Sequence, residues 1–405
     1  MTLEEAQALD ATDPLAPLRD RFVLPAGVLY LDGNSLGALP RATAEAVFTA
    51  TTHQWGERLI RSWNEGWMDA PRRVGGKIAR LIGAEPDEVI VGDSTSANLF
   101  KLLVAALRAD PTRRAILSEA GNFPTDLHVA EGAIRCVPDA SLRVVDRRDV
   151  QAALGADTAV LLLTHTHYKT AERWDMAAMT RAAHAAGSLV LWDLSHSAGA
   201  IPIDLGDAGA DLAVGCGYKF LNGGPGAPAF LYVARHWQDR LASPLSGWMG
   251  HAEPFAFADE YRPASGMTRW LAGTPAVLGM AALEAGIDVW AEVDDLAQLW
   301  AKSARLFDIL HAAGTAAGLE CVSPLDPNAR GSHISFRHPH AYALCQALIA
   351  KEVIGDFRDP DIIRFGLTPL YLSHGDVWRA GELLREAVAT EAWRDPAYQV
   401  RAAVT

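Results

Sequence analysis

Residues Leu189–Gly224 read LVLWDLSHSAGAIPIDLGDAGADLAVGCGYKFLNGG, and this stretch indicates the fold. It begins with a short apolar run that closes on Asp193. A second run, Asp211–Cys216, leads into a glycine-rich turn that holds Lys219. Short apolar runs bounded by turn residues are typical of buried strands. We therefore expect Asp193 at the carboxyl end of a parallel strand, beyond which ligands of open α/β sheets bind.

Short apolar runs alternate with helical patterns throughout residues 88–234. The seven expected strands are Glu88–Asp93, Ala115–Ser118, Leu142–Asp146, Ala159–His165, Leu189–Asp193, Asp211–Cys216 and Ala229–Val233. Helices are expected between them, notably over Asn98–Arg108 and Met176–Ala186, and Gly187 suits the left-handed position that ends the second helix. Because crossover helices favour parallel pairing, the sequence predicts an α/β fold with one large, mostly parallel seven-stranded sheet.

The pattern changes near Trp290, where a long amphipathic helix over Leu296–Ala313 begins a second, α+β lobe. Its further expected elements are the strands Leu319–Val322, His333–Phe336 and Ile362–Leu367 and the helices Ala341–Lys351 and Val377–Thr390. Near the N-terminus, a short strand over Val28–Asp32 and a turn precede a helix from about Thr43. We expect three parts: an N-terminal arm (1–45) that packs on the small lobe or crosses the active site, a large domain (46–285) and a small domain (286–405).

The composition is that of a compact globular protein, since 50% of the 405 residues are hydrophobic and 21% are charged. A net charge of −13 works against nucleic acid or an anionic membrane as a partner, because such affinity comes largely from Lys and Arg. No apolar run approaches the roughly 18 residues of a membrane helix. Met1–Asp20 lacks the basic and apolar regions of a signal peptide, so we expect a cytoplasmic protein.

The cysteines and one histidine pair offer little metal chemistry. The four cysteines lie far apart without a C-x-x-C pair, which argues against a zinc site or a disulfide framework. A catalytic cysteine would be Cys216, three residues before Lys219, but a small buried thiol is the favoured interpretation. His165 and His167 have no third ligand nearby, so we expect no metal site.

Lys219 and Asp193 together match the needs of pyridoxal 5′-phosphate. This cofactor requires a lysine for its Schiff base, a phosphate pocket, a carboxylate at the ring nitrogen and a flat group against the ring. An exposed loop lysine is the alternative for Lys219. Asp193 favours the cofactor interpretation because an unpartnered buried carboxylate is costly, although it could also cap the turn at Ser195–Ser197. His196 either contacts the cofactor or is a buried, satisfied histidine.

Two further segments suit the remaining parts of such a site. Ser94–Ser96 joins a strand to a helix, and free amides and hydroxyls at a helix start bind phosphate. Plain capping of that helix is compatible with this role. Asn122–Asp126 follows the strand Ala115–Ser118, so Phe123 would lie against the ring and Asp126 near its polar edge, with a place in the core as the alternative for Phe123.

Six motifs and one strand together resemble the kynureninase family. They are Tyr30–Gly37 (YLDGNSLG), Ile60–Asn64 (IRSWN), Asn122–Asp126 (NFPTD), Trp192–Gly199 (WDLSHSAG), Tyr218–Gly224 (YKFLNGG), Ser246–His251 (SGWMGH) and Ile362–Gly366 (IIRFG). The resemblance covers nearly the whole chain. Ser195 and Phe220 depart from it, since the family often has Ala and Tyr there, and both changes are small.

The resemblance implies a fold-type I pyridoxal phosphate enzyme that hydrolyses L-kynurenine to anthranilate and L-alanine in tryptophan catabolism. It also implies a homodimer whose active site is shared between the subunits. Three residues are expected to be catalytic: Lys219, Tyr218 and Asp193. Cofactor contacts are expected from Thr95, Ser96, Phe123, Pro124, Thr125, Asp126, Thr164, Asp193, His196, Tyr218 and Lys219, and from Trp248 and Thr274 of the other subunit. Substrate contacts are expected from Arg364, Asn34, Ser35 and Trp63.

The resemblance also suggests individual roles. Lys219 would take the Cα proton of the substrate, Asp193 would keep the ring protonated, and Tyr218 would transfer a proton in later steps. Arg364 would bind the α-carboxylate, because its planar fork suits bidentate binding. Trp63, Gly273 and Thr274 resemble the bacterial pattern, which predicts a preference for kynurenine over its 3-hydroxy derivative.

Two other functions remain as alternatives. A cysteine desulfurase or class V aminotransferase would share the fold, but a desulfurase needs a mobile nucleophilic cysteine, and none of the four lies in a convincing exposed loop. A non-catalytic pyridoxal phosphate carrier would need no carboxylate clamp. The presence of both Lys219 and Arg364 argues against that carrier.

Overall fold

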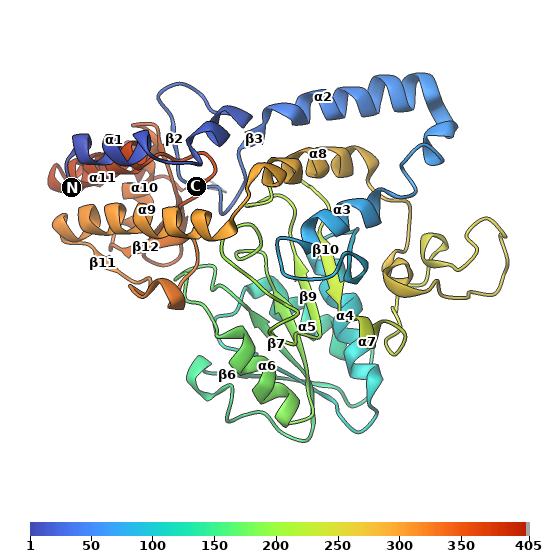
Figure 1. Cartoon of the computed structure of the whole chain (residues 1–405). Coiled ribbons are helices and arrows are strands. Elements are labelled where there is room, and N and C mark those ends of the chain that lie inside the picture. The colour runs from blue at the N-terminus through green and yellow to red at the C-terminus, as the bar shows by residue number, and fades with distance from the viewer. Residues whose placement is uncertain (402–405) are drawn as a thin grey trace.

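The computed structural model describes residues 1–401, and its largest element is a seven-stranded sheet (Figure 1). The strand order is β4-β10-β9-β8-β7-β5-β6. Their bounds are Val89–Val91 (β4), Ala115–Glu119 (β5), Ser141–Val145 (β6), Thr158–Thr164 (β7), Leu189–Asp193 (β8), Leu212–Gly215 (β9) and Phe230–Val233 (β10). Only β10 runs antiparallel to its neighbours among these described strands. All seven expected strands and the mostly parallel sheet are therefore confirmed.

Helices cover the large sheet. They are α3 (Ala70–Ala79), α4 (Thr95–Ala109), α5 (Pro124–Ile134), α6 (Met176–Ala185), α7 (Arg235–Gln238) and α8 (Val277–Asp288). Helix α4 begins three residues before the expected Asn98, because the Ser94 hydroxyl caps it by accepting a hydrogen bond from the Ala97 amide. Gly187 follows α6 with φ of 74°, as the left-handed C-cap position requires.

A second, antiparallel sheet belongs to the C-terminal part of the chain. Its order is β11 (Glu320–Cys321), β12 (His333–Arg337), β15 (Ile362–Gly366) and β14 (Asp356–Arg358). Helices α9 (Leu296–Ala316), α10 (Ala341–Ile349) and α11 (His374–Ala389) pack with it. The strands and helices expected here are present. The three-residue strand β14 was not expected, because it is too short to show a periodic pattern.

The N-terminal segment contacts the parts of the chain that lie around each of the two sheets. It contains α1 (Leu3–Ala11), β1 (Phe22–Val23), β2 (Leu29–Tyr30), β3 (Leu39–Pro40) and α2 (Arg41–Thr49), which a π-helical turn extends through Ala50–Arg58. Strand β2 pairs in parallel with β13 (Val353–Ile354). The Gly37 amide donates to the Tyr218 carbonyl at 2.8 Å, and a Cβ on Gly37 would lie 2.3 Å from the Lys219 carbonyl. Only glycine therefore fits where the segment crosses the lysine turn.

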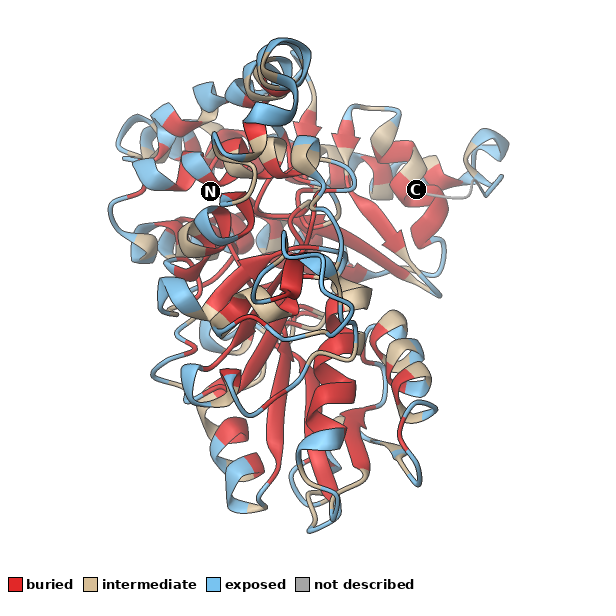
Figure 2. Ribbon diagram, turned by 90° about the vertical axis from the view of Figure 1, so that its right-hand side faces the viewer, coloured by how far each residue is buried: buried red, intermediate tan, exposed pale blue. Residues whose placement is uncertain are grey.

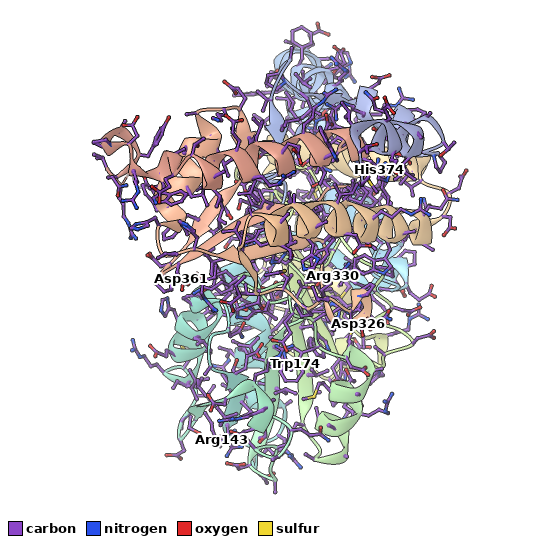
Figure 3. The ribbon with its side chains drawn as sticks, turned by 90° about the vertical axis from the view of Figure 1, so that its left-hand side faces the viewer. Arg143, Trp174, Asp326, Arg330, Asp361 and His374 are labelled. Atoms are coloured by element: carbon purple, nitrogen blue, oxygen red, sulfur yellow. The ribbon has the colours of Figure 1, made fainter. Side chains whose placement is uncertain are left out.

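The core follows the sheets, and Figure 2 shows their strands as almost continuously buried between helices with exposed outer faces. Arg330 lies beneath α9 (Figure 3), where its guanidinium sits 3.6 Å from the Phe307 ring centroid and its backbone bridges to Glu172 beside the large sheet. Buried contacts thus join the two sheets. Over residues 1–401, no helix combines the length and apolarity needed to span a membrane.

Candidate active site

Lys219 lies in the turn that follows β9, and its side chain is buried. Its Nζ is 2.9 Å from His196 Nε2, which comes from the turn after β8. Burial lowers the pKa of the Lys219 amine, even though Asp193 nearby favours its charged form. A lowered pKa increases the neutral, nucleophilic fraction of the amine. Because the side chain is buried, the alternative of an exposed loop lysine is wrong.

Carboxylates gather at the same edge of the large sheet. Thr164 at the end of β7 pairs in register with Asp193 at the end of β8. The Thr164 hydroxyl also donates to Asp126 Oδ2 at 3.3 Å from the first turn of α5. Burial, and then the neighbouring Asp193, raise the pKa of Asp126 well above its usual range. Burial beside Asp193 therefore favours the protonated form of Asp126.

Asp193 both caps the turn that follows β8 and lies at the candidate site. It is 3% exposed, and its Oδ1 accepts a hydrogen bond from the Ser195 amide at 2.7 Å, as the capping alternative requires. Its register with Thr164 also brings it beside Asp126 and on the same edge as Lys219. The local cap thus orients the carboxylate without removing it from the site.

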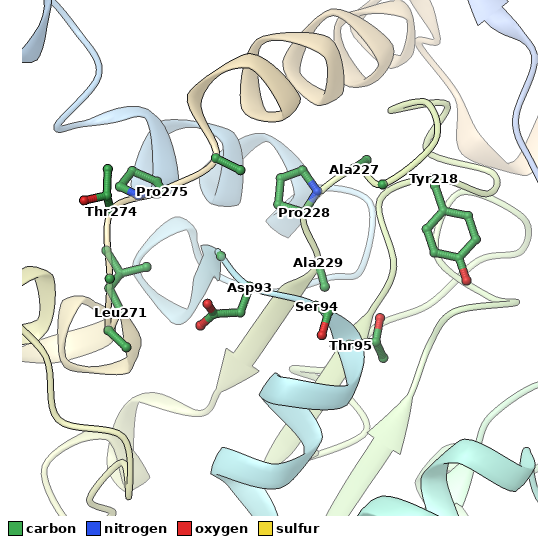
Figure 4. A pocket seen from close by; sticks show the side chains of 15 residues that line it. Asp93, Ser94, Thr95, Tyr218, Ala227, Pro228, Ala229, Leu271, Thr274 and Pro275 are labelled. Atoms are coloured by element: carbon green, nitrogen blue, oxygen red, sulfur yellow. The ribbon is translucent and has the colours of Figure 1, made fainter.

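A cavity of about 470 Å³ lies where β4 meets α4. Thr95 lines it from the first turn of α4, and Tyr218 lines it from the lysine turn. Figure 4 shows Thr274 on the opposite side of the cavity from Tyr218, on the same chain. Ser96 follows Thr95 in the first turn of a fifteen-residue helix, whose free amides and dipole favour an anion.

Phe123 is only partly buried, with 37% of its surface exposed, so it is not a core residue. Lys219 Nζ lies 5.8 Å from the centroid of its ring and 5.7 Å from that of Tyr218. Pro124 and Thr125 form the start of α5 directly after it. The amine of Lys219 therefore lies near two aromatic rings.

Arg364 is fully buried on β15, although its charge alone would indicate a strand surface. Its Nε donates to Asp356 Oδ1 at 2.8 Å, and its Nη2 donates to Asp356 Oδ2 and, at 3.0 Å, to the Ser35 hydroxyl. The Tyr168 carbonyl accepts from Nη1. Arg358 adds a second guanidinium, 2.6 Å from Asp356. A rigid cation thus faces the site from the small sheet.

Two buried carboxylates near Arg364 differ in charge. Burial opposes ionisation of Asp356, but Arg364 and Arg358 outweigh it and hold the pKa of that carboxyl below its usual range. Burial and the Asp356 charge instead raise the pKa of Asp32 to about 7. The cluster therefore contains one firmly ionised carboxylate and one that titrates near neutrality.

The remaining expected substrate residues lie in two places. Asn34 is buried against Gly366, and within residues 1–401 neither of its amide atoms has a hydrogen-bond partner. Trp63 packs on Trp248, with ring centroids 6.3 Å apart, in an aromatic group separate from the Lys219 contacts described above. Ser35 is the member of this set that touches Arg364.

Sequence reasoning missed four residues of this region: Asp32, His333, Asp356 and Arg358. Asp356 and Arg358 belong to the short strand β14 and gave no periodic signal. His333 was expected only as the start of a strand. A search for ionisable residues in otherwise apolar strands would have found His333 and Arg364, since buried charges require partners.

Comparison with known proteins agrees with this geometry. The family model described as Kynureninase C-terminal domain matches residues 299–384. The kynureninase of Burkholderia mallei strain SAVP1 is 51% identical over 100% of both chains, and that of Deinococcus radiodurans is 52% identical over 94% of this chain and 95% of its own. The chain belongs to the kynureninase family. It is accordingly an enzyme.

Solved structures extend the likeness in shape beyond kynureninases. The apo cysteine desulfurase of Thermococcus onnurineus NA1 superposes with a TM-score of 0.77 at 18% identity, over 92% of this chain and 98% of that one. A form of C-DES with glycine covalently linked to its PLP cofactor gives 0.79 at 18% identity, over 90% and 98%. The expected fold-type I architecture is therefore confirmed for this member of the kynureninase family.

Proposed function

We propose that this chain hydrolyses the Cβ–Cγ bond of L-kynurenine with pyridoxal 5′-phosphate, releasing anthranilate and L-alanine. The observation that carries the proposal is the buried Lys219 amine, which shares one sheet edge with Asp193, Asp126 and Phe123 and lies close enough to the buried Arg364 of the small sheet for that cation to lower its pKa further. Family membership supports the same reaction. We further propose that the reaction serves tryptophan catabolism.

The residues fit the proposed cofactor. A neutral lysine amine is what a Schiff base requires, and Asp193 offers an anion for a protonated ring nitrogen. Asp126 and His196 offer polar groups at the edge of the ring, and the Thr164 hydroxyl donates a hydrogen bond to Asp126. Phe123 offers its exposed face, and Thr95 and Ser96 offer hydroxyls and amides for the phosphate. Pro124 and Thr125 would contact the cofactor from the start of α5.

In the proposed reaction, bound pyridoxal phosphate supplies a protonated ring that accepts electrons when bonds at the substrate's Cα and Cβ break. Arg364, Ser35 and Asn34 bind and orient the α-carboxylate end. Lys219 takes the Cα proton and returns a proton in later steps. One water adds to the γ-carbonyl, so the Cβ–Cγ bond breaks with the carboxylate of anthranilate on one product and the methyl carbon of alanine on the other.

Tyr218 is the proposed proton carrier for the later steps. Its side chain lines the cavity and lies beside Lys219, and burial, followed by the nearby Cys216 and Asp193, raises the pKa of its phenol. A phenol that keeps its proton can donate it to a developing carbanion. Tyr218→Phe should therefore lower kcat by roughly a hundredfold in protein that is saturated with cofactor, and full activity of this variant would refute the role.

We propose that the enzyme prefers kynurenine to 3-hydroxykynurenine and acts more weakly on the latter. Trp63, Gly273 and Thr274 support this, because they resemble the bacterial pattern. The test is the ratio of kcat/KM for the two substrates. Equal values would contradict the preference.

We also propose a cytoplasmic homodimer in which Trp248 and Thr274 contribute to the partner's cofactor site, although Thr274 also lines the cavity of its own chain. Exposed aromatic and aliphatic side chains support association, among them Trp55, Ile60 and Phe257, which are 59%, 76% and 82% exposed. The proposed division of each chain is an arm (1–45), a large domain (46–285) and a small domain (286–405). The pairing of β2 with β13 supports an arm attached to the small domain.

The direct test adds L-kynurenine to purified, cofactor-loaded protein and follows anthranilate by fluorescence and alanine by chromatography. We expect one alanine for each anthranilate, and none of either from Lys219→Ala. Loaded protein that forms no anthranilate but releases sulfide from cysteine would replace this proposal with the desulfurase alternative. Inertness towards both substrates would favour the carrier alternative.

A further inference from the structure

His333 is a buried histidine that the proposed reaction does not yet use. It lies at the start of β12 with no exposed surface, and within residues 1–401 neither of its ring nitrogens has a hydrogen-bond partner. Buried polar groups are nearly always satisfied, because leaving one unpaired is destabilising. Two unpaired nitrogens in one ring therefore make His333 a candidate for a role in the site.

The neighbour that offers such a partner is His196. The centroids of the two rings are 5.7 Å apart at an interplanar angle of 58°. The Nδ1 of His196 is also buried and unpaired in the described chain, whereas its Nε2 faces Lys219 Nζ at 2.9 Å. To form a hydrogen bond, the two rings must rotate and move slightly closer, since nitrogens aligned at this centroid distance still lie beyond an ordinary hydrogen-bond length. The unpaired atoms of His196 and His333 would then satisfy one another.

The strand register also places His333 on the same face of the small sheet as Arg364, the proposed substrate-binding residue. In the β12–β15 pair, His333 stands opposite Gly366 and Ser335 opposite Arg364, so His333 and Arg364 project from the same face of the small sheet. Burial, and then Arg364, lower the pKa of His333 well below its usual range, with further contributions from His167, Lys219 and Arg358. Burial and Lys219 do the same to His196. Both rings are therefore neutral.

Two neutral imidazoles have a definite donor and acceptor arrangement. If His196 Nε2 accepts from the Lys219 amine, its proton must lie on Nδ1, and that N–H needs an acceptor. An unprotonated nitrogen of His333 is the acceptor that the structure provides. We propose that His333 is a positioning residue, which accepts a hydrogen bond from His196 Nδ1 and thereby fixes His196 Nε2 as the acceptor facing Lys219.

The consequence is a chain of contacts from the small sheet to the reactive amine. His333 would hold the orientation and tautomer of His196, and His196 would hold Lys219 towards the substrate. The catalytic effect of His333 rests on the proposed function, whereas the tautomer of His196 does not. The two parts can therefore be tested separately.

The first test is nitrogen NMR of the full chain, freed of cofactor and labelled with ¹⁵N-histidine. The His196 signals are assigned by their loss in His196→Gln. We expect wild-type His196 as the Nδ1–H tautomer, and a change of about tenfold in the tautomer ratio in His333→Phe, which keeps a ring but removes both nitrogens. His333→Asn and His333→Gln carry an amide oxygen near the two nitrogen positions, so one of them should restore the wild-type signals.

The matched control is His374→Phe. His374 is another buried histidine, at the start of α11 and far from the large sheet (Figure 3), and its Nδ1 is hydrogen-bonded to Asp10. It should lower the melting temperature without moving the His196 signals. If His333→Phe behaves like this control, or if neither amide variant restores the signals, His333 is only a packing residue and the proposal is wrong.

The second test uses the cofactor-loaded enzyme. In His333→Phe, the pKa read from the absorbance of the lysine-bound cofactor should move by about one unit, and kcat/KM should fall about tenfold, with the amide variant that restores the tautomer restoring both. A changed tautomer with unchanged absorbance would overturn the link from His196 to Lys219. A protein that binds no cofactor would refute the proposed function and leave the tautomer result standing.

Discussion

Replacing Asp356 with Asn tests whether the buried charge pair with Arg364 holds the small sheet and the substrate site together. Asp356 is 1% exposed and Arg364 has no exposed surface. The carboxylate accepts two hydrogen bonds from Arg364 and one from the Ser35 hydroxyl, and it lies 2.6 Å from Arg358. Asn keeps one acceptor but removes the charge, which leaves two guanidinium groups without a firmly ionised partner.

Removing one partner of a buried ion pair costs about 3–5 kcal/mol. We expect about 3 kcal/mol less stability for Asp356→Asn, because the amide oxygen keeps part of the bonding and Asp32 can ionise once the neighbouring charge is gone. The assay is urea unfolding at pH 8, followed by the KM for kynurenine, which should rise as Arg364 loses its orientation.

Glu320→Gln is the matched control, since it breaks the exposed pair with Arg337 in the same sheet and should leave the free energy of unfolding nearly unchanged. Equal unfolding curves for the two variants would refute the account of Asp356. An unchanged KM would show that Arg364 does not depend on this carboxylate for its orientation.

Three other predictions follow from the same contacts and surfaces. The folded pKa of Asp32, about 7, exceeds that of an unfolded carboxyl, so the contribution of Asp32 to stability falls as the pH rises from about 4 to 7. Asp32→Asn should therefore raise the free energy of unfolding at pH 8 but not at pH 4. A gain that is independent of pH would contradict this prediction. Arg364→Lys should raise the KM for kynurenine about tenfold or more, since a lysine cannot bind Asp356 through a planar fork and keep a further N–H for the substrate, and an unchanged KM would rule out carboxylate binding there. Sedimentation should give twice the chain mass of 43.5 kDa, and Ile60→Glu should shift it towards the monomer; a monomeric wild type would contradict the shared site.

The large sheet could be predicted from sequence because each of its strands is a short apolar run bounded by turn residues. Leu189–Asp193 was expected with its observed bounds. The starts of helices were less certain, since Ser94 caps α4 at a position that its apolar pattern does not mark. Strand β14 could not be predicted, because three residues cannot show an alternating pattern and the strand depends on pairing with β15.

The candidate site was predictable where local sequence and strand order agree. Asp193 and Lys219 each follow an apolar strand, so their meeting at one sheet edge follows from parallel pairing. The raised pKa of Asp126 could not be inferred, because it depends on burial and on a carboxylate that lies far away in sequence. The same holds for Arg364, whose partner Asp356 is contributed by a strand that only tertiary pairing creates.

The most direct test of the central claim is to find which lysine carries the cofactor. Borohydride reduction of the yellow, cofactor-loaded protein makes the bond to the lysine permanent, and mass spectrometry of the digested chain then locates the added phosphopyridoxyl mass. The account predicts that mass on the peptide containing Lys219. Its presence on Lys101 or Lys302, which are also buried, or on no lysine at all, would contradict the account.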